Sequence, residues 1–264
     1  MKKIILLVSS VVLLTSCSKN SSDDANPTQT PTLLTRIQTT KNNVIENENF
    51  IYNGSKIVKV TNSNNYETRF TYSGDLISQI ESFTNNVSKG STTYTYTNDK
   101  LIGTYSIEVT PTITYRNRTA FTNNTDGSIN YTRYTISSSN VETQVGRGKY
   151  TIVNGNLTKD EYTSTSYNEI INYTYDTKNN ALRNILGIDK IINSDDLSLN
   201  NVLSRNEVSN NTLSGGNPYQ ATTNNTYIYS YNSNNFPTSS IRTETYISPL
   251  SPSTTTTENK NYFY

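Results

Sequence analysis

The sequence predicts an all-β protein, an antiparallel meander of hairpins that forms one large twisted or curled sheet. The pattern does not decide whether this sheet closes into a barrel. Three observations support this. Aromatic residues alternate with threonine, as in Tyr94-Thr95-Tyr96, and a period of two places alternate side chains on opposite faces of a strand. Short Asn/Gly/Asp turns follow, which suit tight hairpins. The whole unit recurs along the chain.

Each recurring unit has an aromatic strand, a turn and an aliphatic strand. Tyr52, Tyr72 and Tyr96 are 20 and 24 residues apart in the sequence, which is the length of two strands with their turns. Successive units therefore predict successive hairpins. The copies lie at 50–58, 70–77, 94–102, 121–129, 150–157, 173–178 and 227–236.

These units resemble the YD-type repeats of Rhs and teneurin-like proteins, and more closely the Tyr-rich repeat lipoproteins of Bacteroidota. Tyr175-Asp176 is the best match to the YD motif, although the Gly-Arg pair that follows it in that family is absent. The resemblance covers about residues 45–264 and implies a β-hairpin repeat without an assigned activity. The chain has too few repeats for an encapsulating shell of the Rhs type.

Four segments depart from the repeat. Residues 181–192 have a more helical apolar spacing, and we expect one short helix or irregular turn there, which packs across the sheet or acts as a lid. Residues 209–226 and 248–259 are rich in Ser, Thr, Asn and Pro and predict long exposed loops. Residues 146–149 predict a loop between strands. The terminal residues 262–264 alternate again and predict a paired strand.

The N-terminus predicts an exported lipoprotein. Lys2 and Lys3 precede an apolar run that is too short to span a bilayer. Leu14-Thr15-Ser16-Cys17 then resembles the lipobox of bacterial lipoproteins. The chain thus divides into a signal peptide at 1–16, a lipid-anchored flexible tether at 17–32 and one repeat-built β domain at 33–264. The alternative is an ordinary signal peptide with a chance cysteine.

The lipobox resemblance implies cleavage between Ser16 and Cys17, a diacylglycerol on the thiol and a further acyl chain, such as palmitate, on the new amine. More than one chain gives stable anchoring. By the same resemblance, Ser18 favours the outer membrane, and residues 21–24 are similar to the acidic export signal of surface lipoproteins. We therefore expect an outer-membrane, lipid-anchored protein, with cell-surface display as the further expectation.

Composition excludes several chemistries. The chain contains no histidine and a single cysteine, so histidine-dependent catalysis, thiol catalysis and His or Cys metal sites are unavailable. Its formal charge is +1 without Lys/Arg runs, which argues against nucleic-acid partners. The Gly146-Arg147-Gly148-Lys149 segment lacks the spacing of a phosphate loop. We expect no cofactor.

Carboxylates are the remaining catalytic groups. Two of them across a cleft would suit a glycoside hydrolase, but the four candidates lie on separate strand positions without a marked pair: Glu142, Asp160, Glu161 and Glu169. Residues 176–180 and 193–196 cluster oxygen ligands that calcium could use. Asp and Asn are also ordinary turn residues, and we favour that interpretation.

The recurring tyrosines at 72, 96, 175 and 229 carry the main functional hypothesis. Tyr72, Tyr96, Tyr175 and Tyr229 either supply the core or form an aromatic binding face for a glycan or a partner protein. A non-catalytic binding or interaction module at the cell envelope is therefore the first hypothesis. A structural envelope component that acts with a membrane protein is the second, and a carboxylate-dependent glycoside hydrolase is the third.

Overall fold

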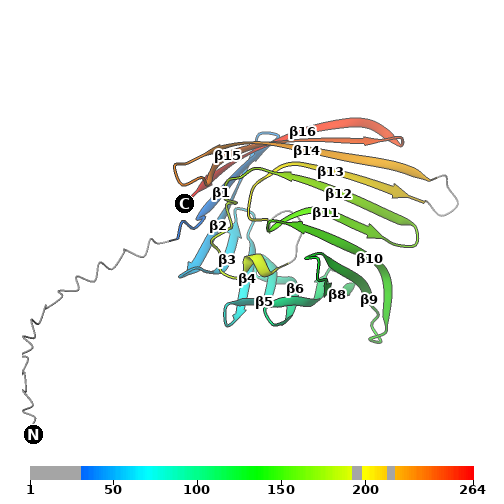
Figure 1. The fold of residues 1–264 in the computed structure, drawn as a ribbon. Coiled ribbons are helices and arrows are strands. Elements are labelled where there is room, and N and C mark those ends of the chain that lie inside the picture. Colours follow the sequence, from blue (N-terminus) through cyan, green and yellow to red (C-terminus); the bar gives the residue numbers. More distant parts are fainter. Residues whose placement is uncertain (1–30, 192–197, 213–217) are drawn as a thin grey trace, which may run out of the picture. The chain divides into compact units, whose positions relative to one another are not determined.

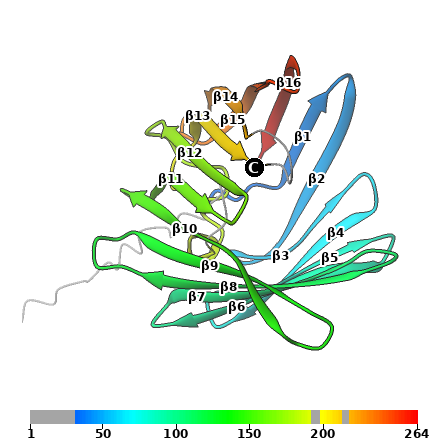
Figure 2. The same cartoon turned by 90° about the vertical axis from the view of Figure 1, so that its right-hand side faces the viewer.

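The protein is a closed antiparallel β-barrel. The computed structural model describes residues 31–191, 198–212 and 218–264, and Pro31–Tyr264 forms one compact unit. Sixteen strands each pair with their neighbours along the chain, and the last strand returns to pair with the first (Figures 1 and 2). The all-β meander of hairpins predicted from the sequence is confirmed, and closure makes it a barrel.

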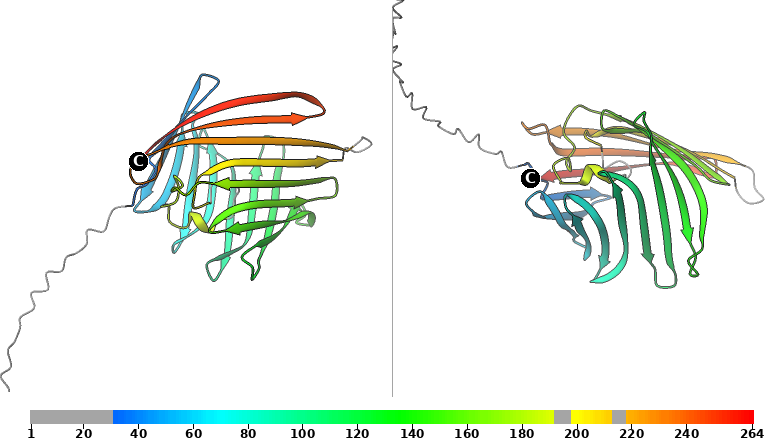
Figure 3. Two further views of the ribbon diagram at one scale, coloured as in Figure 1. Left: turned by 45° about the horizontal axis from the view of Figure 1, so that its top comes forward. Right: turned by 60° about the horizontal axis from the view of Figure 1, so that its bottom comes forward.

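The strands run in chain order around the barrel: β1 (Arg36–Lys41), β2 (Val44–Asn53), β3 (Lys56–Asn62), β4 (Tyr66–Ser73), β5 (Leu76–Thr84), β6 (Val87–Thr97), β7 (Lys100–Val109), β8 (Thr114–Asn123), β9 (Ile129–Ile136), β10 (Glu142–Val153), β11 (Asn156–Thr163), β12 (Tyr167–Tyr175), β13 (Val202–Asn211), β14 (Tyr219–Tyr231), β15 (Pro237–Ser248) and β16 (Ser251–Phe263). The neighbouring arrows alternate in direction (Figure 3). The closing pair aligns Arg36 with Phe263, so the predicted C-terminal strand is paired.

The hairpin turns follow the predicted chemistry. Asn98 and Asp99 between β6 and β7 have φ angles of 50° and 58°, and Asn154 and Gly155 between β10 and β11 have 51° and 76°. Two successive positive φ angles match the right-handed twist of the flanking strands. Asn tolerates this conformation better than most residues because its short side chain makes local hydrogen bonds.

In three units the repeated tyrosine donates a hydrogen bond to a backbone carbonyl 18 or 19 residues earlier in the chain and so clamps the two segments together. Tyr52 donates a hydrogen bond of 2.7 Å to the carbonyl oxygen of Leu34. Tyr96 donates likewise to Ile77 at 2.9 Å. The strand register shifts immediately before Tyr52, Tyr72, Tyr96 and Tyr175. Such a bulge re-aims a side chain at a strand end, so the sequence repeat encodes a repeated hydrogen bond.

The described parts of the connection between β12 and β13, residues 176–191 and 198–201, lie across one mouth of the barrel. They bond to hairpin turns from widely separated strands: the Leu186 amide donates to Ser55 at 3.0 Å, and the Asn179 amide donates to Asn235 at 3.0 Å. The β2–β3 and β14–β15 turns that hold these acceptors lie at the same end of the barrel. The expected short helix is present only as a 3-10 turn, η1 (Ile188–Lys190) (Figure 1).

Four local predictions were wrong, and the fourth is the loop at 146–149, which lies within β10. Residues 209–226 and 248–259 are not long loops, because β13, β14 and β16 occupy most of these ranges. In a closed barrel every strand has two neighbours, and β-branched Thr packs well on that pleated surface. The unit at 173–178 does not form a tight hairpin, because β12 ends at Tyr175 and the long connection follows.

The glycines at 146 and 148 lie within β10 rather than in a loop. They make room for aromatic rings. A Cβ atom at Gly148 would lie 2.2 Å from Cζ of Tyr131, and one at Gly146 would lie 2.2 Å from the Tyr162 hydroxyl. Glycine inside a strand often marks such a close approach, and this packing explains the Gly-x-Gly pattern without a phosphate.

The inner and outer faces of the barrel wall carry different kinds of side chain. The inner face, which contacts the connection, carries the buried cluster: Leu101, Phe121, Ile129, Tyr131, Tyr150, Leu157, Ile171, Tyr173 and Val202. The outer face carries Thr, Asn and ion pairs, such as Arg118–Glu142 at 2.6 Å and Lys159–Glu161 at 2.7 Å. The inner face therefore holds the buried core, and the outer face carries charged and polar side chains.

Cys17 and Ser16 lie outside the described residues, as do the signal peptide and most of the tether. Among the residues that are described, none belongs to a helix long and apolar enough to cross a bilayer.

Candidate binding site inside the barrel

A cavity of about 250 Å³ lies between the inner wall and the connection. Its wall is formed by β1, β13, β14, β15 and β16, and the connection covers it with Asn180, Ala181 and Leu182. The other lining residues are Ile37, Asn201, Val202, Tyr227, Tyr229, Ser240, Arg242, Glu258, Lys260 and Tyr262. The cavity therefore combines tyrosine rings with charged groups.

The strand register sets these side chains in two rows. Tyr227 on β14 pairs with Arg242 on β15, and Arg242 pairs with Glu258 on β16. The next row is Tyr229, Ser240 and Lys260. Directly opposed residues on antiparallel strands have Cβ atoms about 4.5–5.5 Å apart. Each row is thus a continuous strip across three strands.

The charged groups of the cavity are held in ion pairs. Arg242 Nη2 lies 3.3 Å from Glu258 Oε2, and Lys260 Nζ lies 3.5 Å from Glu258 Oε1. Arg242 Nη1 also lies 4.0 Å from Glu244, which is beside the cavity and not part of its lining. The two cations of the lining are therefore balanced by Glu258 in the lining and Glu244 next to it.

The tyrosines of β14 form a stacked series. The ring centroids of Tyr227 and Tyr229 are 6.2 Å apart and those of Tyr229 and Tyr231 are 5.9 Å apart. Residues two apart face the same side of a strand, which produces the stack. Burial raises the pKa of Tyr229 far above its ordinary value, so its hydroxyl stays protonated as a hydrogen-bond donor.

The structure separates the four tyrosines of the sequence hypothesis. Tyr72, Tyr96 and Tyr175 are clamps whose hydroxyls donate to Leu186, Ile77 and Leu157. Tyr229 lines the cavity. The four share the inner face but do not form one exposed patch, and Tyr229 is the member that is placed to touch a ligand.

The four candidate carboxylates divide between the two faces. Glu142 and Glu161 lie on the outer face in ion pairs with Arg118 and Lys159. Asp160 and Glu169 lie on the inner face, where Tyr131 donates to Asp160 at 2.8 Å.

Burial raises the pKa of both inner carboxyls, Asp160 and Glu169. The Tyr167 hydroxyl donates to Glu169 at 2.5 Å, and nearby Glu207 raises the pKa of Glu169 further. Arg205 lies 2.6 Å from Glu207. These groups form a polar network on the inner wall, and Asp160 and Glu169 each accept a hydrogen bond from a tyrosine hydroxyl.

The calcium candidate at 176–180 is a turn network. The Asp176 carboxylate accepts hydrogen bonds from the Lys178 amide at 2.9 Å and the Asn201 amide at 3.1 Å, and Tyr231 also donates to it. The candidate at 193–196 lies outside the described residues. Within the part of the chain that is described, no group of three or more acidic or cysteine side chains is placed to hold a metal ion.

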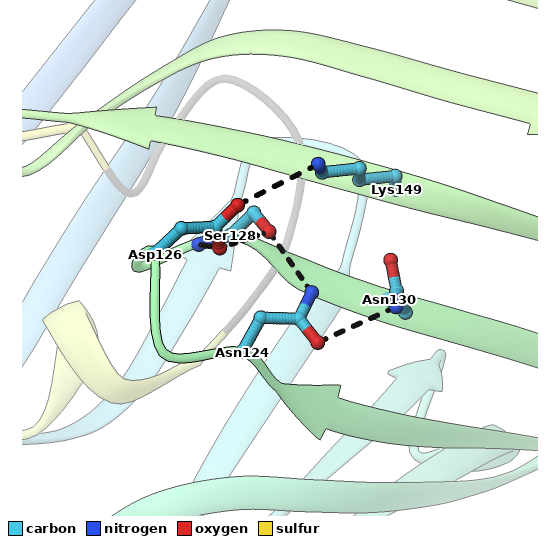
Figure 4. A network of polar contacts seen from close by, with 5 residues as sticks. All are labelled: Asn124, Asp126, Ser128, Asn130 and Lys149. Atoms are coloured by element: carbon cyan, nitrogen blue, oxygen red, sulfur yellow. Dashed lines mark hydrogen bonds and ion pairs between the residues drawn. The ribbon is translucent and has the colours of Figure 1, made fainter.

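The β8–β9 turn shows the same use of acidic and amide side chains (Figure 4). Asp126 accepts from the backbone amide of Ser128 at 2.9 Å and from its hydroxyl at 2.6 Å. Asn124 donates to Ser128 at 2.9 Å, and Lys149 lies 3.8 Å from Asp126. The two bonds from Ser128 lower the pKa of the Asp126 carboxyl.

The barrel fold is shared with two solved structures. A porin-like protein from Bacteroides uniformis aligns with a TM-score of 0.51 at 12% identity, over 88% of this chain and 98% of that one. A porin-like protein from Bacteroides vulgatus aligns with a TM-score of 0.50 at 16% identity, over 88% and 99%. At this identity the likeness shows the fold. No protein-family model and no curated protein matches the sequence.

Sequence reasoning missed the charged half of the cavity. A usable signal was present, because Arg242 and Glu244 are two residues apart, as are Glu258 and Lys260. Charges with a period of two lie on one face of a strand. The sequence does not show that this face points inward, because its direction depends on barrel closure.

Proposed function

We propose that this protein is a non-catalytic binding module of the cell envelope, anchored to the outer membrane by lipid on Cys17, with its barrel outside the hydrocarbon of the bilayer. The observation that carries the proposal is the polar outer face. Arg118 and the Lys159–Glu161 pair lie within their strands on that face, and Arg118 pairs with Glu142 at the start of β10. A lysine or arginine that faces lipid at the bilayer centre costs roughly 2–4 kcal/mol.

The comparison proteins are described as porin-like, and a porin would present an apolar band outward and a water-filled channel inward. This chain has ion pairs outward and a connection across one mouth of the barrel. We therefore favour a lipid-tethered barrel outside the bilayer over a transmembrane channel. In this proposal, the lipidated Cys17 of the lipobox attaches the protein to the membrane.

Acylation is tested by growing cells that express the full chain with an alkyne-tagged palmitate. The wild-type protein is expected to carry the label, and the variant Cys17→Ser is expected to lose it. The variant Thr15→Ser keeps the cysteine and serves as the matched control. A wild-type protein without label would refute the lipid anchor.

The position of the barrel is tested by a protease-recognition sequence inserted between Asn26 and Pro27 of the full chain. Cleavage on isolated membranes should release the barrel into the aqueous phase without detergent, because only the tether holds it. The same insertion without protease should stay in the pellet. A cut barrel that remains with the membrane until detergent is added would contradict the proposal.

A second candidate function is a structural role beside a membrane protein. Ile228 and Ile241 are directly paired on the outer face of β14 and β15, and they are 70% and 43% exposed. Such a pair is an apolar contact point on an outer wall that is rich in Thr and Asn. A photo-crosslinking residue at position 228 should capture an envelope protein in intact cells if this role holds, and position 59 on β3 is the control.

A further inference from the structure

We propose that the cavity under the β12–β13 connection binds one neutral saccharide ring, held against Tyr227 and Tyr229 and hydrogen-bonded by Arg242 and Lys260. This inference rests on the proposed binding function and names its ligand class. It is carried by the size, charge balance and mixed aromatic and polar lining of the cavity, and by a buried polar donor that lacks a partner.

The size of the cavity favours a single ring. Its volume of about 250 Å³ lies just below the roughly 300–1,000 Å³ of pockets that take drug-sized ligands. Asn180, Ala181 and Leu182 of the connection cover it, and the Asn180 amide is fixed by a hydrogen bond of 3.1 Å to the Leu199 carbonyl. A longer oligosaccharide would have to displace this cover.

The charge balance favours a neutral ligand. Glu258 already pairs with both Arg242 and Lys260, and Glu244 provides the second carboxylate. An anionic ligand would have to compete with Glu258 for its cations, and a cationic ligand would compete with Arg242 and Lys260. Breaking one partner out of a buried pair leaves an uncompensated charge, which is costly.

Unused hydrogen-bonding capacity favours a hydroxyl-rich ligand. The buried Nε–H of Arg242 has no hydrogen-bond partner among the described residues. Buried polar groups are normally paired. A ligand hydroxyl accepts from this donor once the Arg242 side chain turns toward the cavity, because the Nε atom itself is buried. Hydroxyls both donate and accept, which also suits the Lys260 and Glu258 groups of the lining.

The tyrosine rings supply the remaining surface. Tyr227 and Tyr229 both line the cavity and are stacked with an interplanar angle of 11°. An aromatic ring offers an apolar body with a polar hydroxyl at its end. A saccharide has the complementary character, with apolar C–H faces and a rim of hydroxyls.

The proposal is tested with the full acylated chain in a detergent that has no sugar headgroup. The probes are D-glucose, D-galactose and N-acetyl-D-glucosamine, with D-glucuronate and D-glucosamine as charged counterparts, and saturation-transfer difference NMR is the readout. We expect transfer to the ring protons of at least one neutral probe. Transfer to none of the three, or stronger binding of a charged counterpart, would overturn the proposal.

Two further measurements place the site. Tyr229→Ala should weaken binding of the responding probe by about tenfold or more, whereas Tyr105→Ala on the outer face should leave it unchanged. In the wild-type protein, the probe should slow amide hydrogen exchange at 180–182, 240–242 and 258–262. Unchanged binding in Tyr229→Ala, or protection elsewhere only, would refute the site. Neither result depends on acylation or on release from the membrane. The saccharide site and the lipid anchor can therefore be refuted independently of each other.

Discussion

Tyr72 on β4 donates a hydrogen bond of 3.0 Å to the carbonyl oxygen of Leu186, which is 114 residues further along the chain. The same hydroxyl accepts a hydrogen bond of 3.2 Å from the Ile57 amide on β3. One phenol group thus joins two strands of the wall to the connection that crosses the mouth. The closure of the mouth is therefore tied to the repeat that builds the wall.

We expect Tyr72→Phe to loosen the connection while the barrel stays folded. The variant loses a donor to Leu186 and an acceptor for Ile57, and each net hydrogen bond contributes about 0.5–1.5 kcal/mol. Amide exchange at 185–191 should accelerate, and urea denaturation should show a loss of about 1–3 kcal/mol. Tyr105→Phe on the outer face is the control, and equal exchange in both variants would contradict the role of Tyr72.

Gly148→Ala should destabilise the barrel strongly. The new Cβ would meet Cζ of Tyr131 and the carbonyl oxygen of Glu161, both at 2.2 Å, and the backbone atom cannot move aside without disturbing the β10–β11 pairing. Overpacking of this kind typically costs about 1–3 kcal/mol. Thermal and chemical denaturation provide the measurement.

The matched control for Gly148 is Gly103→Ala in β7. There the nearest atom to a new Cβ is the Thr119 carbonyl oxygen at 3.4 Å. Alanine also loses less conformational entropy than glycine when it is fixed in a strand. We expect no loss of stability in this variant. A similar loss at both positions would show that the aromatic contacts of Tyr131 are not the reason for glycine at 148.

Asp99→Gly should stabilise the β6–β7 hairpin. Asp99 has a φ of 58°, a conformation that costs an L-residue roughly 1–2 kcal/mol and costs glycine nothing comparable. The greater freedom of glycine in the unfolded chain offsets part of this gain. We expect a small increase in the denaturation midpoint, whereas Asp99→Val should lower it, and the opposite order would contradict the turn assignment.

Glu169→Gln should stabilise the protein near neutral pH and have little effect in acid. Burial and Glu207 raise the pKa of Glu169 above its ordinary value of 4.5, so the folded state holds this proton more tightly than the unfolded state. Stability is therefore lost as pH rises from about 4.5 through the raised pKa. Glutamine stays neutral and avoids that loss.

Urea denaturation of Glu169→Gln and the wild type at about pH 4 and about pH 8 measures this difference. The variant should gain on the order of 1 kcal/mol over the wild type at the higher pH. Because Tyr167 donates to Glu169, Tyr167→Phe should act in the opposite direction. A variant that is less stable than the wild type only at the higher pH would reverse the sign and refute the assignment.

The sequence by itself determined the strand class, the positions of most hairpin turns and the repeat. These features are local: alternation in Tyr94-Thr95-Tyr96 and the positive φ of Asn98 and Asp99 depend on residues close in the chain. The lipobox around Cys17 is equally local and remains a prediction from sequence.

Only the tertiary structure decided which face is inside and where the cavity lies. Arg242, Glu258 and Tyr229 are distant from the connection in sequence, and they meet it because β16 pairs with β1 and closes the barrel. The four threonines at 254–257 became part of a strand for the same reason. Alternation with a period of two places every second side chain on the same face of a strand. Long-range strand pairing alone decides whether that face points to the lumen or to solvent.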